Sequence, residues 1–140
     1  MRLSGVDPLT PEQRSKCMSR IRGRNTKPEL VVRSLVHALG YRFRLHRRDL
    51  PGTPDLVLPR LRKIIFVHGC FWHQHAGCKL ATLPKSRQEF WLPKLKANGN
   101  RDRRNERALR KLGWGVMTVW ECQLRDAKRL TGRIRRFLGE

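Results

Sequence analysis

The chain has 140 residues, a length that suits one domain with a single buried core. Its 32 lysines and arginines against 11 acidic residues give a formal net charge of +21, which a compact fold tolerates best when a polyanion neutralises it. With 39% hydrophobic residues and no long apolar run, the composition excludes a disordered chain and predicts no transmembrane helix.

The basic residues are spread along the whole chain and do not form a tail. This distribution favours a folded body that binds DNA or RNA, with a ribosome-type basic protein or a solvated charged surface as the alternatives. The N-terminal segment has no apolar stretch, so we expect no secretory signal and a cytoplasmic protein. Thiols stay reduced there, and clustered cysteines then indicate a metal before a disulfide.

The first part of the chain is predicted to form two helices. One is capped by Thr10 and runs to about Ile21. The other begins after the cap Thr26, carries Glu29 in its first turn and stops at Gly40. Its apolar residues recur at helical spacing: Leu30, Val31, Leu35, Val36 and Leu39.

Three strands are predicted next. Residues 41–46 alternate between apolar and polar types, as a half-buried strand does, and residues 55–58 form a short strand. The β-branched run 63–68 indicates a central strand. Residues 60–62 are too few for anything but a hairpin link, so the last two strands are expected to be antiparallel.

The second half is predicted to contain two helices, at residues 87–96 and 101–112, and then a strand at 114–120. A basic amphipathic helix at 128–138 ends the chain. This order of helices and strands predicts a single α/β domain, spanning residues 1–140, with a central mixed sheet.

The stretch VHGCFWHQHAGC, residues 67–78, holds three of the five histidines and two of the four cysteines. Cys70, His75 and Cys78 lie in this loop, and Cys122 follows a later strand. Three cysteines and one histidine make a closed tetrahedral set that suits structural zinc. Because the spacing is not that of a standard zinc finger, the alternative is two loop cysteines and an unrelated buried Cys122.

An acid at the start of one strand and a histidine at the end of its antiparallel neighbour is a layout found in metal-dependent nucleases. Asp55 would be the carboxylate that holds Mg²⁺, and His68 and His73 would move protons or contact the scissile phosphate. The alternatives are a turn-capping aspartate and hydrogen-bonded structural histidines.

Phe71 and Trp72 are adjacent large aromatics in the same loop. Neighbouring rings of this size are not expected to face one core. Aromatic wedges that enter a base step open duplex DNA, and these two rings are candidates for that role. The alternative is that at least one ring packs over the metal loop.

Five stretches carry a resemblance to a known family: RSKCMSRIRGRNTKPE, LPGTPDLVLP, IIFVHGCFWHQHAGCKLA, EFWLPKLKANGNRDRRN and LGWGVMTVWEC, which together span residues 14–122. The chain closely resembles the very-short-patch mismatch repair endonucleases (Vsr) of bacteria. The resemblance implies a restriction-endonuclease-like (PD-(D/E)xK-type) three-layer α/β fold with a structural zinc site. It also implies that residues 1–24 form an N-terminal helical arm that contacts DNA.

The resemblance assigns catalytic roles by position. Asp55 matches the metal-binding aspartate of the restriction-endonuclease class, and His68 stands in place of its lysine. His73 matches the second catalytic histidine, and Glu29 matches the helix-borne acid. Mg²⁺ would be held by Asp55 and by the backbone carbonyl of Val67, at a position where the family often has threonine.

The resemblance also matches the structural zinc ligands and the DNA-intercalating aromatics. Gly77 precedes the third ligand as if one residue were inserted, and glycine is expected to accommodate the extra turn. The implied zinc ligands are Cys70, His75, Cys78 and Cys122, and the implied intercalating rings are Phe71, Trp72 and Trp91.

The implied function is a Mg²⁺-dependent, strand-specific endonuclease that nicks 5′ of the thymine in a T:G mismatch left by 5-methylcytosine deamination. Such an enzyme initiates very short patch repair, acts as a monomer at the bacterial nucleoid, and has a MutL-type repair protein and a cytosine-5 methyltransferase as possible partners. The alternatives are a related nicking endonuclease of a restriction–modification system and a non-catalytic zinc-stabilised DNA-binding protein.

Overall fold

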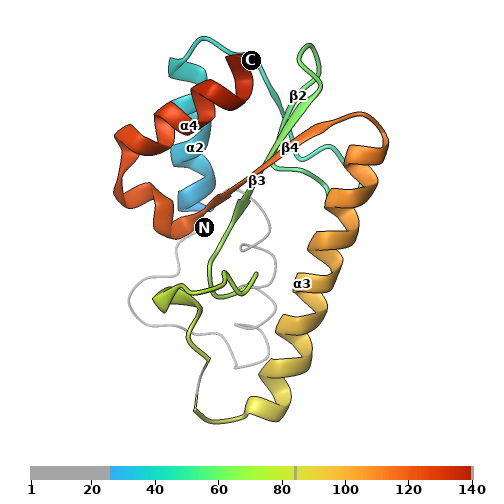
Figure 1. Cartoon of the computed structure of the whole chain (residues 1–140), viewed down its shortest axis with the longest axis vertical. Helices are drawn as coiled ribbons and strands as arrows, with labels where there is room; N and C mark the ends of the chain where they lie inside the picture. The colour runs from blue at the N-terminus through green and yellow to red at the C-terminus, as the bar shows by residue number, and fades with distance from the viewer. Residues whose placement is uncertain (1–25, 84, 140) are drawn as a thin grey trace, which may run out of the picture.

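The computed structural model describes residues 26–83 and 85–139 (Figure 1). The predicted helix from Thr10 to Ile21 and the predicted arm at residues 1–24 lie outside this part of the chain. The described elements are α2 (Lys27–Ala38), β1 (Arg44–Leu45), β2 (Leu56–Leu58), β3 (Lys63–His68), the 3-10 helix η1 (Lys79–Ala81), α3 (Gln88–Lys111), β4 (Gly115–Trp120), the 3-10 helix η2 (Glu121–Arg125) and α4 (Ala127–Gly139).

The four described strands form one mixed sheet in the order β1-β2-β3-β4. The hairpin of β2 and β3 is antiparallel, with Val57 opposite Ile64, whereas β3 and β4 are parallel. The mixed sheet and the antiparallel hairpin predicted from the sequence are therefore confirmed. Since His68 is the register neighbour of Trp120 in the parallel pair, the loops that follow β3 and β4 leave the sheet at the same end.

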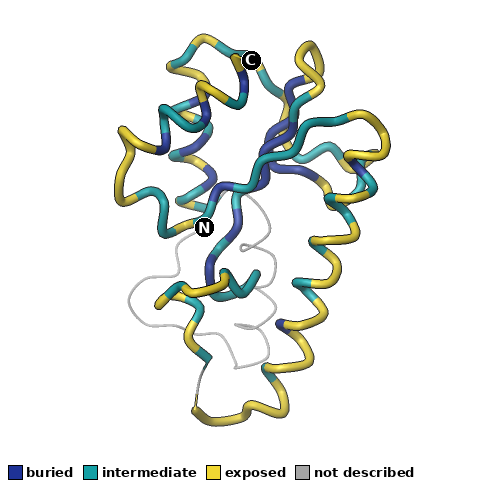
Figure 2. Tube along the Cα trace, viewed as in Figure 1, coloured by how far each residue is buried: buried dark blue, intermediate teal, exposed yellow. Residues whose placement is uncertain are grey.

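Helices cover both faces of the sheet: α2 and α4 lie on one face and α3 runs along the other (Figure 1). Strands β2 and β3 are mostly buried (Figure 2). The core between the sheet and α2 and α4 contains Val32, Val36, Leu56, Leu58, Ile65, Val119, Leu130, Ile134 and Leu138. The core on the α3 side contains Val57, Ile64, Phe66 and Leu109. Alternate strand residues thus supply the two cores, as the pleat requires.

Two expectations about strands and faces are wrong in detail. The strand predicted at 41–46 is reduced to Arg44–Leu45, and both residues are exposed. Its aromatic residues Tyr41 and Phe43 pack against the α2–α4 core from an extended lead-in. In α2, Leu30 is 47% exposed, and the buried positions are Glu29, Val32 and Val36. The buried stripe of this helix is therefore rotated from the apolar pattern so that it includes an acid.

The two helices predicted at 87–96 and 101–112 are one continuous helix, α3, with Pro93 inside it. The asparagines and glycine at 98–100 do not end it, because the middle of the helix is fixed by tertiary contacts. Leu95 is buried, and the Asn98 side chain donates to the Trp72 carbonyl at 3.2 Å. Across the described residues, no helix is both long and apolar enough to cross a bilayer.

Candidate functional site

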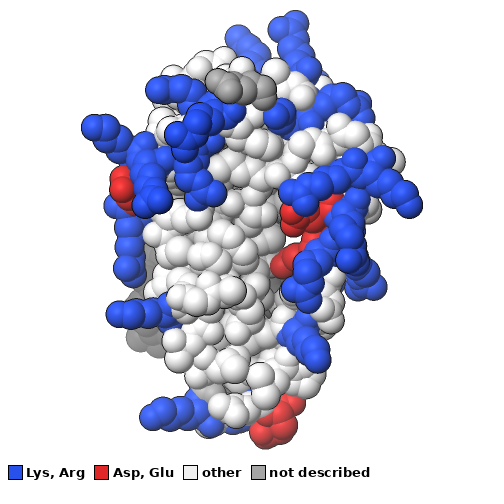
Figure 3. Space-filling view, viewed as in Figure 1, with Lys and Arg blue, Asp and Glu red and all other residues white. Residues whose placement is uncertain are grey.

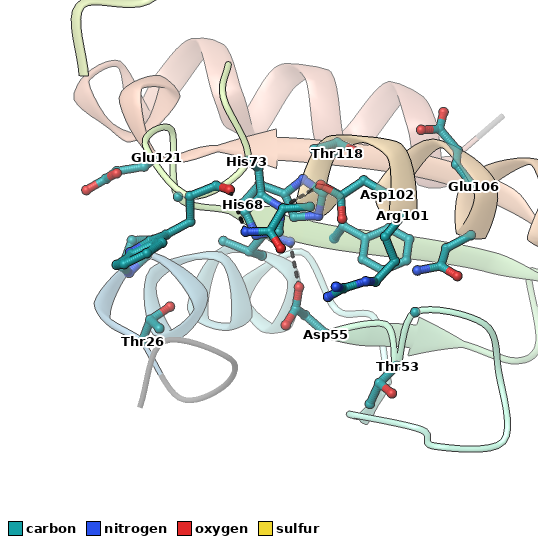
Figure 4. Close-up of a pocket in the computed structure, with 18 residues that line it drawn as sticks. Thr26, Thr53, Asp55, His68, His73, Arg101, Asp102, Glu106, Thr118 and Glu121 are labelled. Carbon is teal, nitrogen blue, oxygen red and sulfur yellow. Dashed lines mark hydrogen bonds and ion pairs between the residues drawn. The ribbon is translucent and has the colours of Figure 1, made fainter. Parts of the chain in front are cut away.

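A cavity opens where the N-terminus of α2, the turn before β2, the end of β3 and the middle of α3 converge (Figure 4). Asp55, His68, His73 and Asp102 all point into its centre (Figure 4). Predicted catalytic residues from three separate segments of the chain are thus brought together, and an acid from α3 joins them.

Asp55 lies at the entrance to β2 with only 8% of its surface exposed. Its carboxylate accepts a hydrogen bond from the Val67 backbone N–H at 2.7 Å, which fixes it beside the end of β3. Burial raises the pKa of Asp55 to about 8, with a contribution from nearby Glu29 and against the lowering effect of the Val67 N–H. A bound cation would relieve this cost by stabilising the ionised form.

Glu29 lies in the first turn of α2, where Thr26 caps the helix as predicted. Its buried carboxylate pairs with Arg33 and lies 2.8 Å from His46 Nε2. The ligand atoms of Glu29, His46 and Asp55 all lie within 4.8 Å of one another. The structure therefore places Glu29 close to Asp55, and its catalytic role stays a prediction. It also adds His46 and Arg33, which the sequence interpretation did not single out.

The rings of His68 and His73 stack in parallel, with centroids 3.8 Å apart and an interplanar angle of 6°. His68 is buried, and no residue in the described ranges hydrogen-bonds its Nδ1. Burial, reinforced by His73 and opposed by Asp102, lowers the pKa of His68 to about 3. His68 is therefore a neutral ring at physiological pH, held by packing.

His73 is in a different environment, with 28% of its side chain exposed. Its Nδ1 lies 2.6 Å from the Asp102 carboxylate, which is 26% exposed. A carboxylate on one ring nitrogen orients the imidazole and leaves the other nitrogen available for proton transfer. Of the two histidines, His73 has the geometry of a proton carrier.

Asp102 is the site residue that sequence reasoning missed. It belongs to a polar stripe on α3 that faces the cavity, made of Asn98, Asp102, Asn105 and Glu106. Their spacing of about four residues marks one polar face of an otherwise arginine-rich helix, but it does not single out Asp102. Arg101 extends from the same helix toward Asp55 (Figure 4), and no carboxylate of residues 26–83 or 85–139 forms an ion pair with it.

The predicted zinc ligands also come together. The Sγ atoms of Cys70, Cys78 and Cys122 and a ring nitrogen of His75 lie within 4.8 Å of one another. The His75 Nδ1 is 3.7 Å from Cys70 Sγ and 3.4 Å from Cys122 Sγ. Tetrahedral zinc with bonds of about 2.1–2.3 Å would separate neighbouring ligand atoms by roughly 3.5 Å. The donor set and its spacing therefore fit a tetrahedral metal ion.

The local chain is shaped for this cluster. Gly77 has a φ of +71°, a conformation that favours glycine, and it turns the chain so that Cys78 follows in place. The expected glycine turn is confirmed. Burial raises the pKa of the Cys70 thiol to about 12, so only a metal would hold this sulfur as a thiolate at neutral pH.

The predicted intercalating rings form one cluster beside the metal loop. Phe71 and Trp72 meet edge to face at 5.1 Å, and Trp91 lies 5.5 Å and 5.9 Å from them. The three rings are half-buried and belong to neither of the two hydrophobic cores, so their role as intercalating rings stays a prediction. Phe90, 46% exposed, extends the cluster to the surface, and Lys94 lies over three of its rings.

Trp120 connects the two polar clusters. Its ring stacks on His75 with centroids 4.2 Å apart and 8° between the planes. It also meets His68 edge to face at 5.3 Å. The cysteine–histidine cluster and the histidine pair are therefore in contact through a single indole.

Comparisons with known proteins agree with this geometry. A family described as "DNA mismatch endonuclease Vsr" matches residues 6–79. The type II nicking enzyme V.XorIIP of Xanthomonas oryzae is 55% identical over 133 residues, which cover 95% of this chain and 97% of the relative. The DNA mismatch endonuclease Vsr of Escherichia coli is 48% identical over 118 residues, or 84% of this chain and 75% of the relative. The type II nicking enzyme V.NmeAIP of Neisseria meningitidis is 39% identical over 135 residues, or 96% of each chain.

Proposed function

Because this chain belongs to the Vsr family and is a DNA endonuclease, we propose that it nicks one strand of duplex DNA 5′ of the thymine in a T:G mismatch. Such mismatches arise when 5-methylcytosine deaminates, and the nick would begin very short patch repair. The convergence of Asp55, His68, His73 and Asp102 in one cavity carries the proposal. Attack of water on phosphorus with departure of the 3′ oxygen would leave a 5′-phosphate and a 3′-hydroxyl.

The proposed fold is the restriction-endonuclease-like type, as one domain over residues 1–140 with residues 1–24 as a DNA-contacting arm. The covered mixed sheet supports it, as does the position of Asp55 at the start of β2. In this fold an acid-x-lysine usually ends the next strand. Here Phe66, Val67 and His68 end β3, so a neutral ring replaces a charged lysine.

The proposed metal is Mg²⁺, held by Asp55 and by the backbone carbonyl of Val67. A carboxylate and a carbonyl oxygen are hard ligands of the type Mg²⁺ prefers, and Val67 is already anchored to Asp55 through its N–H. When bound, Mg²⁺ would stabilise the charge that develops on the phosphate. Glu29 would place its carboxylate beside Asp55 and either orient a water or support a second hydrated cation.

Side chains of the cavity would supply proton transfer and contacts to the phosphate. His73, supported by Asp102, would transfer a proton through its free ring nitrogen. His68 would contact the phosphate as a neutral hydrogen-bonding ring. Arg101 has a guanidinium with no acidic partner in the described ranges, and it would meet the incoming phosphate from the α3 side.

The aromatic cluster of Phe71, Trp72 and Trp91 would enter the duplex beside the mismatch, with zinc holding its loop through Cys70, His75, Cys78 and Cys122. Stacking on a base is worth about 1–3 kcal/mol per ring, so Trp72→Ala should reduce mismatch affinity while metal content is unchanged. Equal affinity of the variant and the parent would assign these rings to packing.

The charge of +21 suits a duplex partner. A monomer with one cavity suits single-strand cutting, and a MutL-type protein and a cytosine-5 methyltransferase are the proposed partners.

A second candidate is a nicking enzyme that accompanies a restriction–modification system. It is favoured by relatives named as type II nicking enzymes, one of them 55% identical across 95% of this chain. The chemistry would be the same, and the flanking sequence around the mismatch would differ.

A strand-resolved cleavage assay separates these functions. Duplexes with a T:G pair or a C:G pair at one position, each in varied flanking sequence, would be incubated with the protein and Mg²⁺. We expect nicks only in the thymine strand of the mismatched duplex, and none in EDTA. Cutting of fully paired sites would contradict mismatch specificity. Activity confined to one flanking sequence would identify the methyltransferase system that the enzyme serves.

A further inference from the structure

Among the described strands, β4 is an edge of the sheet, and none of them pairs with its outer side. In a parallel pair, the N–H and C=O of one residue point the same way and alternate along the strand. Gly115 donates to Arg62 O on the β3 side at 2.8 Å, so the backbone groups of Val116, Thr118 and Trp120 point outward. The Trp120 N–H confirms this direction, because Gln123 Oε1 accepts it at 3.0 Å. Within residues 26–83 and 85–139, the outward donors and acceptors of Val116 and Thr118 have no backbone partner.

This edge lacks the usual protection. Proteins block exposed edges with charged residues, prolines, bulges or covering segments, yet β4 reads GVMTVW and contains none of these residue types. In the view of Figure 1, β4 lies in front between α4 and α3, and Figure 3 shows an uncharged band down the middle of this face, with lysines and arginines on both sides. The edge is thus accessible, apolar and flanked by positive charge.

A groove runs between this edge and α4. It is lined by Val116, Met117 and Thr118 of β4 and by Arg133, Arg136 and Phe137 of α4. Neither arginine forms an ion pair with an acid of the described chain. Both therefore offer their charge to whatever occupies the groove, which we call the β4-edge groove.

We propose that the β4-edge groove binds an extended acidic segment of a partner protein as an additional strand of the sheet. Such a segment would pair its backbone with Val116 and Thr118 and place its carboxylates against Arg133 and Arg136. This assignment does not depend on the catalytic roles proposed above.

Two other occupants match the groove less well. A DNA backbone offers only acceptors, so it would satisfy the outward N–H groups but would face the outward carbonyls of the same edge with like charge. A second copy of this chain would bring another +21 of charge, with Arg133 and Arg136 repeated at the contact. An acidic peptide alone matches both the alternating backbone groups and the arginines.

The test uses the full chain and a labelled eight-residue peptide of alternating valine and glutamate with blocked termini. A second peptide carries N-methyl groups on alternate amides, in both possible phases, which keeps the charge but removes backbone donors. We expect the unmodified peptide to bind, and one phase of N-methylation to weaken binding about tenfold through lost backbone hydrogen bonds. Val116→Pro should do the same, since proline is tolerated where an edge N–H faces solvent.

Matched arginine variants complete the test. Arg133→Gln should weaken the peptide by several-fold, whereas Arg135→Gln, an exposed neighbour outside the groove, should not. Equal binding of all N-methylated peptides would show charge attraction alone and would overturn the proposal. So would no binding at about 1 mM peptide, or a loss of duplex DNA affinity in Arg133→Gln as large as the loss of peptide affinity. The peptide comparison on the parent protein decides the matter even if Val116→Pro does not fold.

Discussion

The cysteine–histidine cluster and the catalytic cavity share one loop, residues 69–78, and both reach the end of β4, yet they are built in opposite ways. In the cluster, the four donor atoms all lie within 4.8 Å of one another, and Cys70 is fully buried. In the cavity, Asp55, His73 and Asp102 hold hydrogen bonds to other groups and still line an open space. A metal ion surrounded by four protein ligands has no open coordination position, which suits a structural role. Side chains that line an open space can contact a substrate, which suits catalysis.

Burial also distinguishes individual groups within the two regions. It keeps the Cys70 thiol and the His68 ring uncharged in the absence of a metal. His73 and Asp102 remain partly exposed as a hydrogen-bonded pair. We therefore propose proton transfer to solvent or substrate for the exposed pair, and shape and metal ligation for the buried groups.

The largest expected effect separates the two regions completely. Asp55→Asn should abolish DNA cutting, since a neutral amide binds Mg²⁺ much more weakly than a carboxylate does, but it should leave the zinc content at one equivalent and mismatch binding intact. The assay is cleavage of a T:G duplex, with metal analysis and DNA binding on the same preparation. Cutting at more than a small fraction of the parent rate would remove Asp55 from the metal site.

The same variant should stabilise the metal-free protein. The pKa of Asp55 is raised by burial from 3.8 to about 8, so between these values the unfolded chain ionises while the folded carboxyl stays protonated. The free energy of unfolding therefore falls as pH rises toward 8. The Asn variant escapes this loss, and its amide oxygen can still accept from the Val67 N–H. Its Tm should exceed the parent's at pH 8 in EDTA, and the gap should shrink near pH 4.

Loss of one ligand of the cysteine–histidine cluster is expected to reduce metal binding, stability and activity together. Cys122→Ala removes one of the four ligands, and the loop that carries His73, Phe71 and Trp72 loses its anchor, so metal content, Tm and activity should fall together. Cys17→Ala, which removes the one cysteine of the sequence that is not a proposed ligand, is the matched control. Metal analysis of the parent decides the identity of the ion. Folded, active parent protein with less than about half an equivalent of zinc would contradict a structural zinc site.

The proton carrier is expected to contribute about 10²–10⁴-fold, the range of general acid–base catalysis. His73→Ala should slow single-turnover cutting by that factor, and Asp102→Asn by less, because the ring remains but loses its orienting carboxylate. The double variant should be no slower than His73→Ala alone if the two act as a unit. Additive losses would instead give Asp102 a role of its own. Glu89→Gln, an exposed acid of the same helix that does not line the cavity, is the control.

Much of this molecule could be predicted from the sequence where one local pattern decides the structure. The β2–β3 hairpin follows from a short strand at 55–58, a β-branched run at 63–68 and a short link, and the α2 cap follows from Thr26. The length of α3 could not be read in this way. Its middle carries Asn98, Gly99 and Asn100, which favour a break locally, but contacts with the aromatic loop keep it helical.

The candidate site likewise contains residues that the sequence indicates and residues that only the fold brings in. Asp55, His68, His73 and the cluster ligands stand out because their types are unusual at those positions. Asp102 does not, because one acid in an arginine-rich helix resembles a surface ion pair. Only the arrangement of α3 across the sheet brings it to His73. Trp120 is hidden for a similar reason, since a strand-terminal tryptophan predicts a core residue and nothing in the sequence places it between two histidines.

The smallest expected effect tests the contact between the two regions. His68 has no hydrogen bond at Nδ1 within the described chain, so its orientation depends on His73 and on the edge of Trp120. Trp120→Leu should lower kcat by about tenfold, as expected if losing the edge contact to His68 costs about 1.4 kcal/mol in the positioning of that ring, with KM for DNA and zinc content unchanged. Trp120→Phe keeps an aromatic edge and should restore most of the rate. If the Leu variant loses zinc in parallel with rate, the indole acts by supporting His75. If Phe is as slow as Leu while zinc stays bound, the ring edge does not position His68.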